Sequence, residues 1–320
     1  MKILNFTINS FVLTKTSLLY EDDPYKIIDN PNFHLYAVLS SPICTFIGIK
    51  NINNDLSVAR IKCGSKILEV NLYHDDLGDF DSIKFNFSFN STKTIMKIVQ
   101  IGVKNNIEER TEQNFDANQL YQLYSPSVDF TIEYIGQSFG KNGERNAKKR
   151  AENHKTLQKI LSINNDSFEQ KYIQLLLLNS EYFEAKDGII DEDGVLIGKE
   201  CIISIDDTPK ENDGEFLNLL EAFLINYFKP KYNKEFVSGN IPCEKHQSYS
   251  VIYDLKYNYF SFNAYYNLGL EYSQDINLLT NHAIIQMKNG VLSNRICISI
   301  DEGNIINPEE YYYSFFDYKN

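Results

Sequence analysis

The chain has 320 residues, of which 43% are hydrophobic and 23% are charged, and its formal net charge is −12. This composition is typical of a soluble protein with a packed core, and it excludes disordered, collagen-like and low-complexity chains. No apolar run approaches the about 20 residues of a membrane helix. Polar residues also interrupt the N-terminal segment, where a signal peptide would be apolar. We therefore expect a cytoplasmic protein without a membrane partner.

Residues 1–118 are expected to form a β-rich N-terminal domain. Two strand-like runs flank Gly64-Ser65, which indicates a hairpin. Residues 83–91 alternate between apolar and polar side chains, as a half-buried strand does, and a second strand follows at 95–103. The polar segment 104–118 is predicted to be a linker or a short helix that ends this domain.

Residues 119–236 have a different pattern, with strands and helices in alternation. We predict a strand at 131–138, a helix at 145–161, a buried strand at 172–180 and a helix at 215–228, which Pro230 ends. The pattern is typical of a small mixed α/β domain.

Two further segments complete the predicted organisation. Turn signals at Asp187-Gly188 and Asp193-Gly194 indicate an acidic β-hairpin inserted near 181–214. Residues 237–320 return to short aromatic strands and form a β-rich C-terminal region. The predicted fold class is therefore α+β, with a small mixed α/β core between two β-rich regions.

Charge is unevenly distributed along the chain. Residues 181–215 contain twelve acidic residues and three lysines, whereas residues 140–159 contain seven basic and two acidic residues. A net charge of −12 alone argues against a nucleic-acid partner, but a local basic segment can still bind phosphates. The alternative is a solvated helix face. The candidate nucleic-acid-binding residues are Lys141, Arg145, Lys148, Lys149 and Lys155.

The cysteines indicate a reducing environment. There are five, an odd number, and no two have the spacing of a zinc-binding pair. They are Cys44, Cys63, Cys201, Cys243 and Cys297. A disulfide framework and a cysteine zinc site are not expected.

The predicted helix 215–228 carries a carboxylate on its apolar face. Glu221 lies on the same side of the helix as Leu217, Leu220 and Leu224. A carboxylate in such a place is costly unless it is paired or binds a metal. The alternative is a Glu at the edge of the apolar stripe that reaches solvent or pairs with a lysine.

The predicted helix 145–161 carries a cation and an imidazole on its apolar stripe. Arg150, His154, Leu157 and Leu161 follow one another at helical spacing. Tyr134 lies just before the point where its strand ends at Gly136. Each of these residues alone is more commonly structural than functional.

Taken together, these segments resemble the GIY-YIG nuclease superfamily, and in particular its restriction-endonuclease-like branch. The resemblance rests on YIGQS at 134–138, KRAENH at 149–154 and LLEAFLINYFKPKYN at 219–233, in this order. It covers only about residues 119–236. It implies a nuclease fold and assigns functional roles to Arg150, His154, Glu221 and Asn233.

The first half of the name motif, Gly-Ile-Tyr, is absent as written. The nearest candidate for its tyrosine is Tyr124, ten residues before Tyr134, with Tyr121 as the second choice. We therefore take Tyr124, Tyr134, or both as the tyrosines of the site.

The resemblance implies hydrolysis of a phosphodiester bond. Glu221 would bind Mg²⁺ or Mn²⁺, and Arg150 would stabilise charge on the phosphate. A tyrosine would orient or deprotonate the attacking water, with His154 as a proton acceptor. Asn233 matches an Asn of the same branch.

We therefore expect a metal-dependent endonuclease in restriction or phage defence. DNA is favoured over RNA as its substrate, but the sequence does not decide between them. The alternative is a catalytically silent nucleic-acid-binding or interaction protein that reuses the fold. The sequence leaves open whether the protein is a monomer or a homodimer.

Overall fold

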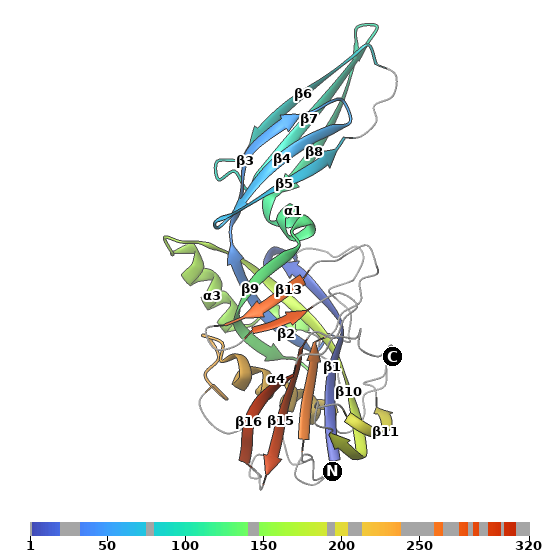
Figure 1. Ribbon diagram of the computed structural model, residues 1–320. Coiled ribbons are helices and arrows are strands. Elements are labelled where there is room, and N and C mark those ends of the chain that lie inside the picture. The colour runs from blue at the N-terminus through green and yellow to red at the C-terminus, as the bar shows by residue number, and fades with distance from the viewer. Residues whose placement is uncertain are drawn as a thin grey trace. The chain divides into compact units, whose positions relative to one another are not determined.

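The computed structural model describes most of the chain in segments (Figure 1). They are residues 2–19, 33–74, 80–139, 147–190, 196–203, 213–237, 259–264, 275–280, 284–287, 294–301 and 304–311. These residues form a mixed α+β fold, mostly strands in three sheets, with four α-helices among the described segments. The predicted α+β class is thus confirmed. None of the described helices is both long and apolar enough to cross a membrane.

The chain divides into two compact units. Unit 1 contains residues 1–40, 129–167 and 173–320, and unit 2 contains residues 41–128 and 168–172. The predicted boundary at residue 118 lies inside unit 2, and the predicted N-terminal domain is shared between the units. The reason is that strand β2 (Leu35–Pro42) pairs with strand β9 (Ser127–Gln137), so unit 2 is almost entirely an insertion between two neighbouring strands.

Unit 2 contains two three-stranded antiparallel sheets. They are formed by β3 (Cys44–Asn51), β4 (Leu56–Cys63) and β5 (Lys66–Tyr73), and by β6 (Ser82–Phe89), β7 (Ile95–Lys104) and β8 (Ile107–Asp116). Phe46, Ile61 and Val70 from the first sheet share one buried cluster with Met96 and Ile98 from the second. The predicted hairpin at Gly64 and the predicted strands at 83–91 and 95–103 are confirmed.

The prediction of a linker or short helix at 104–118 is wrong for most of its length. Asn105 and Asn106, with φ of 50° and 63°, form a tight turn between β7 and β8, and Asn tolerates this left-handed backbone better than most residues. Helix α1 (Ala117–Tyr124) follows β8, and the Asp116 carboxylate caps it by accepting the backbone N–H groups of Asn118 and Gln119. The strand was missed because β8 is mostly polar and exposed.

Unit 1 is built on one large mixed sheet. Its order is β14-β13-β9-β2-β10-β1-β12-β15-β16, and β11 pairs with β10. The strands not yet defined are β1 (Lys2–Lys15), β10 (Lys171–Ile190), β11 (Leu196–Ile203), β12 (Tyr259–Ala264), β13 (Asp275–Leu279), β14 (Ile284–Met287), β15 (Asn294–Asp301) and β16 (Asn304–Tyr311). The strands of the predicted C-terminal region therefore belong to the same sheet as β2 and β9.

The predicted acidic hairpin is present as β10 and β11. Their register runs from Tyr182 opposite Ile203 to Ile190 opposite Leu196. The strand predicted at 172–180 continues without interruption into the hairpin, because β1 pairs with β10 over both parts.

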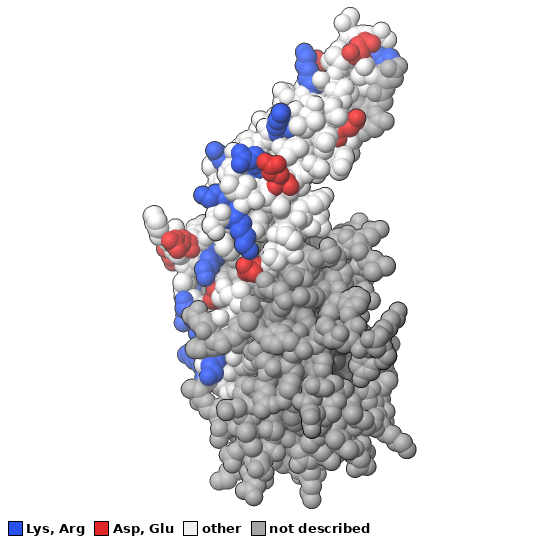
Figure 2. All heavy atoms as spheres, in the orientation of Figure 1, with Lys and Arg blue, Asp and Glu red and all other residues white. Residues whose placement is uncertain are grey.

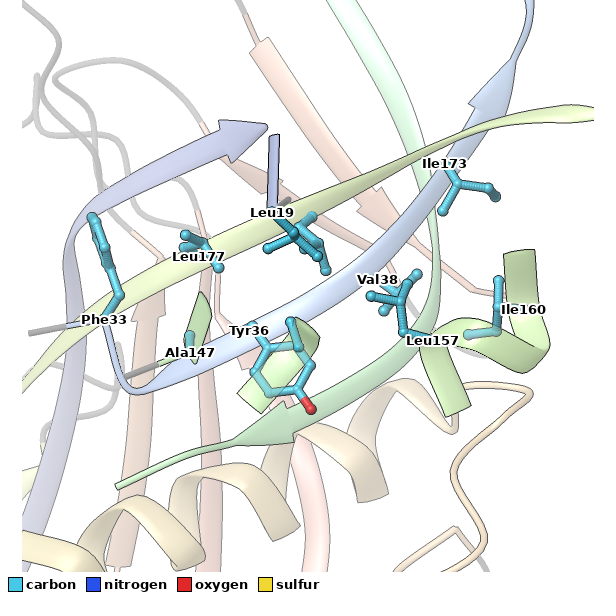
Figure 3. Packing of buried hydrophobic residues seen from close by; sticks show 11 residues of the cluster. Leu19, Phe33, Tyr36, Val38, Ala147, Leu157, Ile160, Ile173 and Leu177 are labelled. Atoms are coloured by element: carbon cyan, nitrogen blue, oxygen red, sulfur yellow. The ribbon is translucent and has the colours of Figure 1, made fainter. Parts of the chain in front are cut away.

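The predicted helix 145–161 is interrupted. Helix α2 (Ala147–Glu152) ends before Asn153, His154 adopts an extended backbone with φ −85° and ψ 112°, and helix α3 (Lys155–Asn165) begins after it. Together with the short 3₁₀ helix η1 (Thr16–Leu19), α2 and α3 contribute to a core cluster with β2 and β10 (Figure 3). The break sets His154 outside both helices, so it does not continue the apolar stripe as predicted.

Helix α4 (Asp213–Phe228) confirms the predicted helix at 215–228 and begins two residues earlier. It is buried on almost all sides, with Phe216, Leu220, Phe223 and Phe228 each 4% exposed or less. Apolar residues all around a helix are typical of a buried element.

Candidate active site

Two tyrosines on neighbouring strands form the centre of the candidate site. In the β2–β9 ladder Tyr36 lies opposite Gly136, and Val38 lies opposite Tyr134. Tyr36 and Tyr134 are therefore diagonal neighbours on one face of the sheet, where large side chains can touch, and their ring centroids are 6.1 Å apart. Figure 3 shows Tyr36 inside the core cluster with its hydroxyl directed toward β9.

Burial changes the acidity of both phenols. It raises the pKa of Tyr36 above the usual range of a tyrosine, and the nearby Tyr134 raises it further. The pKa of Tyr134 is raised to about 12, mainly by burial and also by the charge of Glu221. Both side chains are therefore neutral phenols at pH 7. Among the described residues, no hydrogen bond of good geometry satisfies the Tyr36 hydroxyl, although the charge of Arg150 and a weaker hydrogen bond with its side chain lower the pKa of Tyr36.

Gly136 makes room for this pair of tyrosines. A Cβ atom at residue 136 would lie 2.8 Å from Cε1 of Tyr134 and 2.8 Å from Cζ and Oη of Tyr36. All three atoms belong to the side chains of rigid aromatic residues, which cannot bend aside. The glycine of the Tyr-Ile-Gly segment is therefore required by close packing of the site.

If the site cleaves phosphodiester bonds, as the sequence predicts, we expect Gly136→Ala to reduce both the stability of the fold and the rate of cleavage. Overpacking of this kind costs about 1–3 kcal/mol in the free energy of unfolding, and the displaced rings would lose their geometry. Urea denaturation and a plasmid-nicking assay check the two effects. Gly48→Ala is the control, because a Cβ at residue 48 would have nothing within 4 Å. A fully active, equally stable Gly136→Ala protein would contradict this account of the packing.

His154 lies against the two tyrosines. Its ring centroid is 4.9 Å from that of Tyr134 and 6.1 Å from that of Tyr36, and its Nε2 is 3.4 Å from the Tyr134 hydroxyl oxygen. Burial lowers the pKa of His154, and the charge of Arg150 lowers it further. The imidazole is therefore neutral at pH 7 and can accept a proton. Its Nδ1 is buried without a hydrogen-bond partner among the described residues.

Glu221 of α4 supplies a carboxylate to the same site. Its side chain is partly buried, and this burial raises its pKa to about 7, although the backbone N–H of Gln137 opposes the rise by a hydrogen bond. The charge of Glu221 acts in turn on Tyr36 and Tyr134. A carboxylate that is difficult to ionise in the free protein is one that a bound cation would stabilise.

Arg150 connects these groups electrostatically. It lies at the end of α2 with an exposed side chain. Its positive charge lowers the pKa of Tyr36, Tyr134, His154 and Glu221 alike. The guanidinium is thus near all four groups and remains open to an anion from solvent.

Asn233 holds the site together rather than facing it. Its carboxamide accepts the backbone N–H of Ile135 at 2.9 Å and donates to the carbonyl of Ile135 at 2.9 Å. The backbone N–H of Tyr232 also donates to the carbonyl of Glu133. The segment that follows α4 is therefore fixed to β9 on both sides of Tyr134. Asn233 is a positioning residue by this geometry.

Gln137 connects α4 to the other end of the site. Its side chain donates to Asn218 of α4 at 2.8 Å and accepts the backbone N–H of Phe139 at 2.9 Å. Because the N–H of Gln137 also bonds to Glu221, one residue fixes the carboxylate relative to β9.

Tyr124 and the other predicted site residues lie in different units of the chain. Tyr124 ends α1 in unit 2, where 51% of it is exposed, whereas Tyr134, Arg150 and Glu221 belong to unit 1. The second choice, Tyr121, is 5% exposed and belongs to the core of unit 2. The tyrosine that sequence reasoning missed is Tyr36, which precedes Tyr134 by 98 residues. The local sequence shows only that Leu35-Tyr36 begins an apolar strand, which does not identify the strand with which it pairs.

The predicted nucleic-acid-binding residues differ in their exposure to solvent. Lys141 and Arg145 lie outside the described residues. Lys149 and Lys155 are exposed, whereas Lys148 is only 8% exposed. Lys149 is next to Arg150, so an anion at the site could reach both.

On the face shown in Figure 2, unit 2 carries both basic and acidic side chains. Several of them are paired in unit 2, as in Arg60 with Glu69 and Lys97 with Glu112. Residues 41–128 contain nine basic and ten acidic residues.

The chain matches no protein-family model, no curated protein and no solved structure.

Proposed function

We propose that this protein is a GIY-YIG-type endonuclease that hydrolyses phosphodiester bonds in DNA with Mg²⁺ or Mn²⁺. The observation that carries the proposal is the cluster of Tyr36, Tyr134, Arg150, His154 and Glu221 on one side of β2 and β9. These residues come from four separate parts of the chain, and a structural core has no need of a carboxylate, an arginine and an imidazole together.

Tyr36 supplies the half-motif that is absent beside Tyr134. It lies on the strand paired with Tyr134-Ile135-Gly136, and Leu35-Tyr36 replaces the Ile-Tyr of the name motif. His34 stands where the motif has Gly. The resemblance therefore extends beyond 119–236 to β2, with unit 2 inserted between the two half-motifs.

The residues present fit one hard divalent cation. Among the described residues there is no group of three or more His, Cys, Asp or Glu side chains that could hold a metal, so Glu221 would be the protein ligand. Mg²⁺ is commonly bound by one or two carboxylates, with water and substrate oxygens as the other ligands. When bound, the cation would stabilise negative charge on the phosphate and on the leaving oxygen.

The other residues would act on the phosphate and on the attacking water. Arg150 would bind a non-bridging phosphate oxygen through its exposed guanidinium. Tyr36 and Tyr134, with pKa values raised above that of free tyrosine, stay protonated and would orient water rather than deprotonate it. His154 is neutral at pH 7, so it is the proton acceptor, reached through the Tyr134 hydroxyl at 3.4 Å.

A nicking assay tests the proposal. The purified protein is incubated with supercoiled plasmid and, in parallel, with single-stranded DNA and RNA, each with Mg²⁺, with Mn²⁺ or with EDTA. We expect metal-dependent nicking of the plasmid and none with EDTA. Cleavage of RNA alone would replace DNA as the substrate, and inactivity on all substrates with both metals would overturn the proposed function.

We expect Lys149→Gln to weaken DNA binding and to reduce its salt dependence. Each lost phosphate contact lowers the slope of log Kd against log salt by about 0.9. Lys148→Gln is the matched control, because the neighbouring Lys148 is buried and its loss should leave the slope unchanged. Fluorescence anisotropy with a labelled duplex at several salt concentrations measures both. Equal slopes in wild type and Lys149→Gln would locate the DNA elsewhere.

A further inference from the structure

Two cysteine thiols lie directly opposite each other in unit 2. Cys44, at the start of β3, is the register partner of Cys63, at the end of β4. Cys44 is buried, at 3% exposure, whereas Cys63 is partly exposed. Neither residue takes part in the candidate active site, and both lie in unit 2.

The backbone hydrogen bonds show whether Cys44 and Cys63 form a hydrogen-bonded or a non-hydrogen-bonded pair of the ladder. The N–H of Cys44 donates to Oδ1 of Asn118 at 2.8 Å, and the N–H of Phe46 donates to the carbonyl of Lys93 at 2.8 Å. Both groups point away from β4, so Cys44 and Cys63 form a non-hydrogen-bonded pair of the antiparallel ladder. Such pairs have Cα atoms about 4.5 Å apart, at the short end of the about 4.4–6.8 Å that a disulfide spans.

The two thiols also point the same way. Sγ of Cys44 and Sγ of Cys63 are 3.9 Å and 3.7 Å from the same acceptor, the carbonyl oxygen of Pro42. A hydrogen bond with the Cys63 thiol, together with burial, raises the pKa of Cys44 above the usual range. The two thiols are therefore near each other, and Cys44 is the more buried of the two.

We propose that Cys44 and Cys63 form a reversible cross-strand disulfide in response to a peroxide. Cys63, the more exposed thiol, attacks the peroxide as a thiolate, which breaks the O–O bond and gives a sulfenic acid and one water or alcohol. Cys44 then attacks the Cys63 sulfur and releases water. Two thiols are oxidised and one peroxide is reduced, with transfer of two electrons.

The position of the pair gives the disulfide a structural effect. It closes the loop from Cys44 to Cys63 and covalently joins β3 to β4 beside Asn118 of α1, which already holds the Cys44 backbone. Cross-linking such a loop restricts the unfolded chain and raises the melting temperature of the unit that contains it. Cys63 is partly exposed, so a thiol reductant can reach the disulfide, as a reversible site requires.

Thiol mapping on the full chain tests the proposal. The reduced protein is treated with one equivalent of hydrogen peroxide, alkylated, digested and analysed by mass spectrometry. We expect a cross-linked peptide pair containing Cys44 and Cys63, a loss of two hydrogens, and full return of both thiols with dithiothreitol. The melting transition of unit 2 should rise by about 5–10 °C on oxidation.

Cys63→Ser provides the second measurement, since a partly exposed position tolerates the hydroxyl. In this variant the peroxide should produce no rise in melting temperature, and Cys44 should remain alkylatable after denaturation. The proposal is overturned if wild-type Cys63 accumulates sulfinic acid while Cys44 stays a free thiol. It is also overturned if neither thiol reacts, or if a cross-linked protein melts at the same temperature as the reduced one.

Discussion

Replacement of Glu221 by glutamine is expected to abolish plasmid nicking at every Mg²⁺ and Mn²⁺ concentration. The amide keeps the shape of the side chain and its place beside the Gln137 backbone, but it loses the charge that attracts a hard cation. Duplex binding should be retained or tighten, because one negative charge near the phosphate is removed. Nicking and anisotropy on the same preparation separate the two effects.

The same variant makes a prediction about stability against pH. The folded pKa of Glu221 is about 7, above the ordinary value of 4.5, so the folded state holds this proton more tightly than the unfolded state. The metal-free wild type therefore loses stability as the pH rises from 4.5 through 7. Glu221→Gln lacks this loss, and its melting temperature should exceed that of the wild type at pH 8 but not at pH 4.

Glu215→Gln is the control, because it changes another carboxylate of the same helix. It should nick DNA at the wild-type rate. If Glu221→Gln nicked normally, or if it melted at a lower temperature than the wild type at pH 8, Glu221 would be a structural ion-pair partner and the proposed mechanism would fail.

Tyr36→Phe is expected to reduce nicking by about 100-fold or more, as loss of a group that positions or relays a proton does. The change removes only the hydroxyl, and that hydroxyl has no strong hydrogen bond among the described residues. Folding should therefore be retained, and the melting temperature should be equal to or above that of the wild type. Single-turnover nicking rates at saturating metal isolate the chemical step.

Tyr124→Phe is the matched control for Tyr36. Its side chain is exposed on unit 2, and the substitution should leave the rate unchanged. The opposite result, with Tyr124→Phe inactive and Tyr36→Phe active, would mean that the pairing of β2 with β9 does not build the site. If both variants nicked DNA at the wild-type rate, only Tyr134 and His154 would remain as candidates for orienting the water and accepting its proton.

Much of the candidate site could be predicted from local sequence. Helix α4 with Glu221 and strand β9 with Tyr134 each carry their own periodicity, and the fold confirms both elements. The basic segment with Arg150 is helical as predicted but forms two helices instead of one. Tyr36 could not be found in this way. Its position beside Tyr134 depends on the pairing of two strands that are 98 residues apart in sequence. The hydrophobic pattern of a strand does not indicate which other strand it pairs with.

The break between α2 and α3 was hidden for a different reason. Residues 145–161 contain neither Gly nor Pro, so propensity favours a single helix. Packing against the core favours two helices instead. Both helices contribute to one buried cluster, through Ala147 and Ala151 of α2 and Leu157 and Ile160 of α3. His154 turns toward Tyr134 as a result of that break.

The insertion of unit 2 between β2 and β9 has a consequence for the order of folding. The site tyrosines can meet only after a loop of nearly ninety residues has closed, and the entropy cost of closure rises by about 0.6 kcal/mol with each doubling of loop length. Residues 44–116 of unit 2 pair through successive hairpins of low contact order, which form quickly. During synthesis this segment can therefore fold first. The folded segment shortens the loop that must close before β9 pairs with β2. Mutations that weaken the hairpins of unit 2 would then delay the pairing of β2 with β9, although they lie in neither strand.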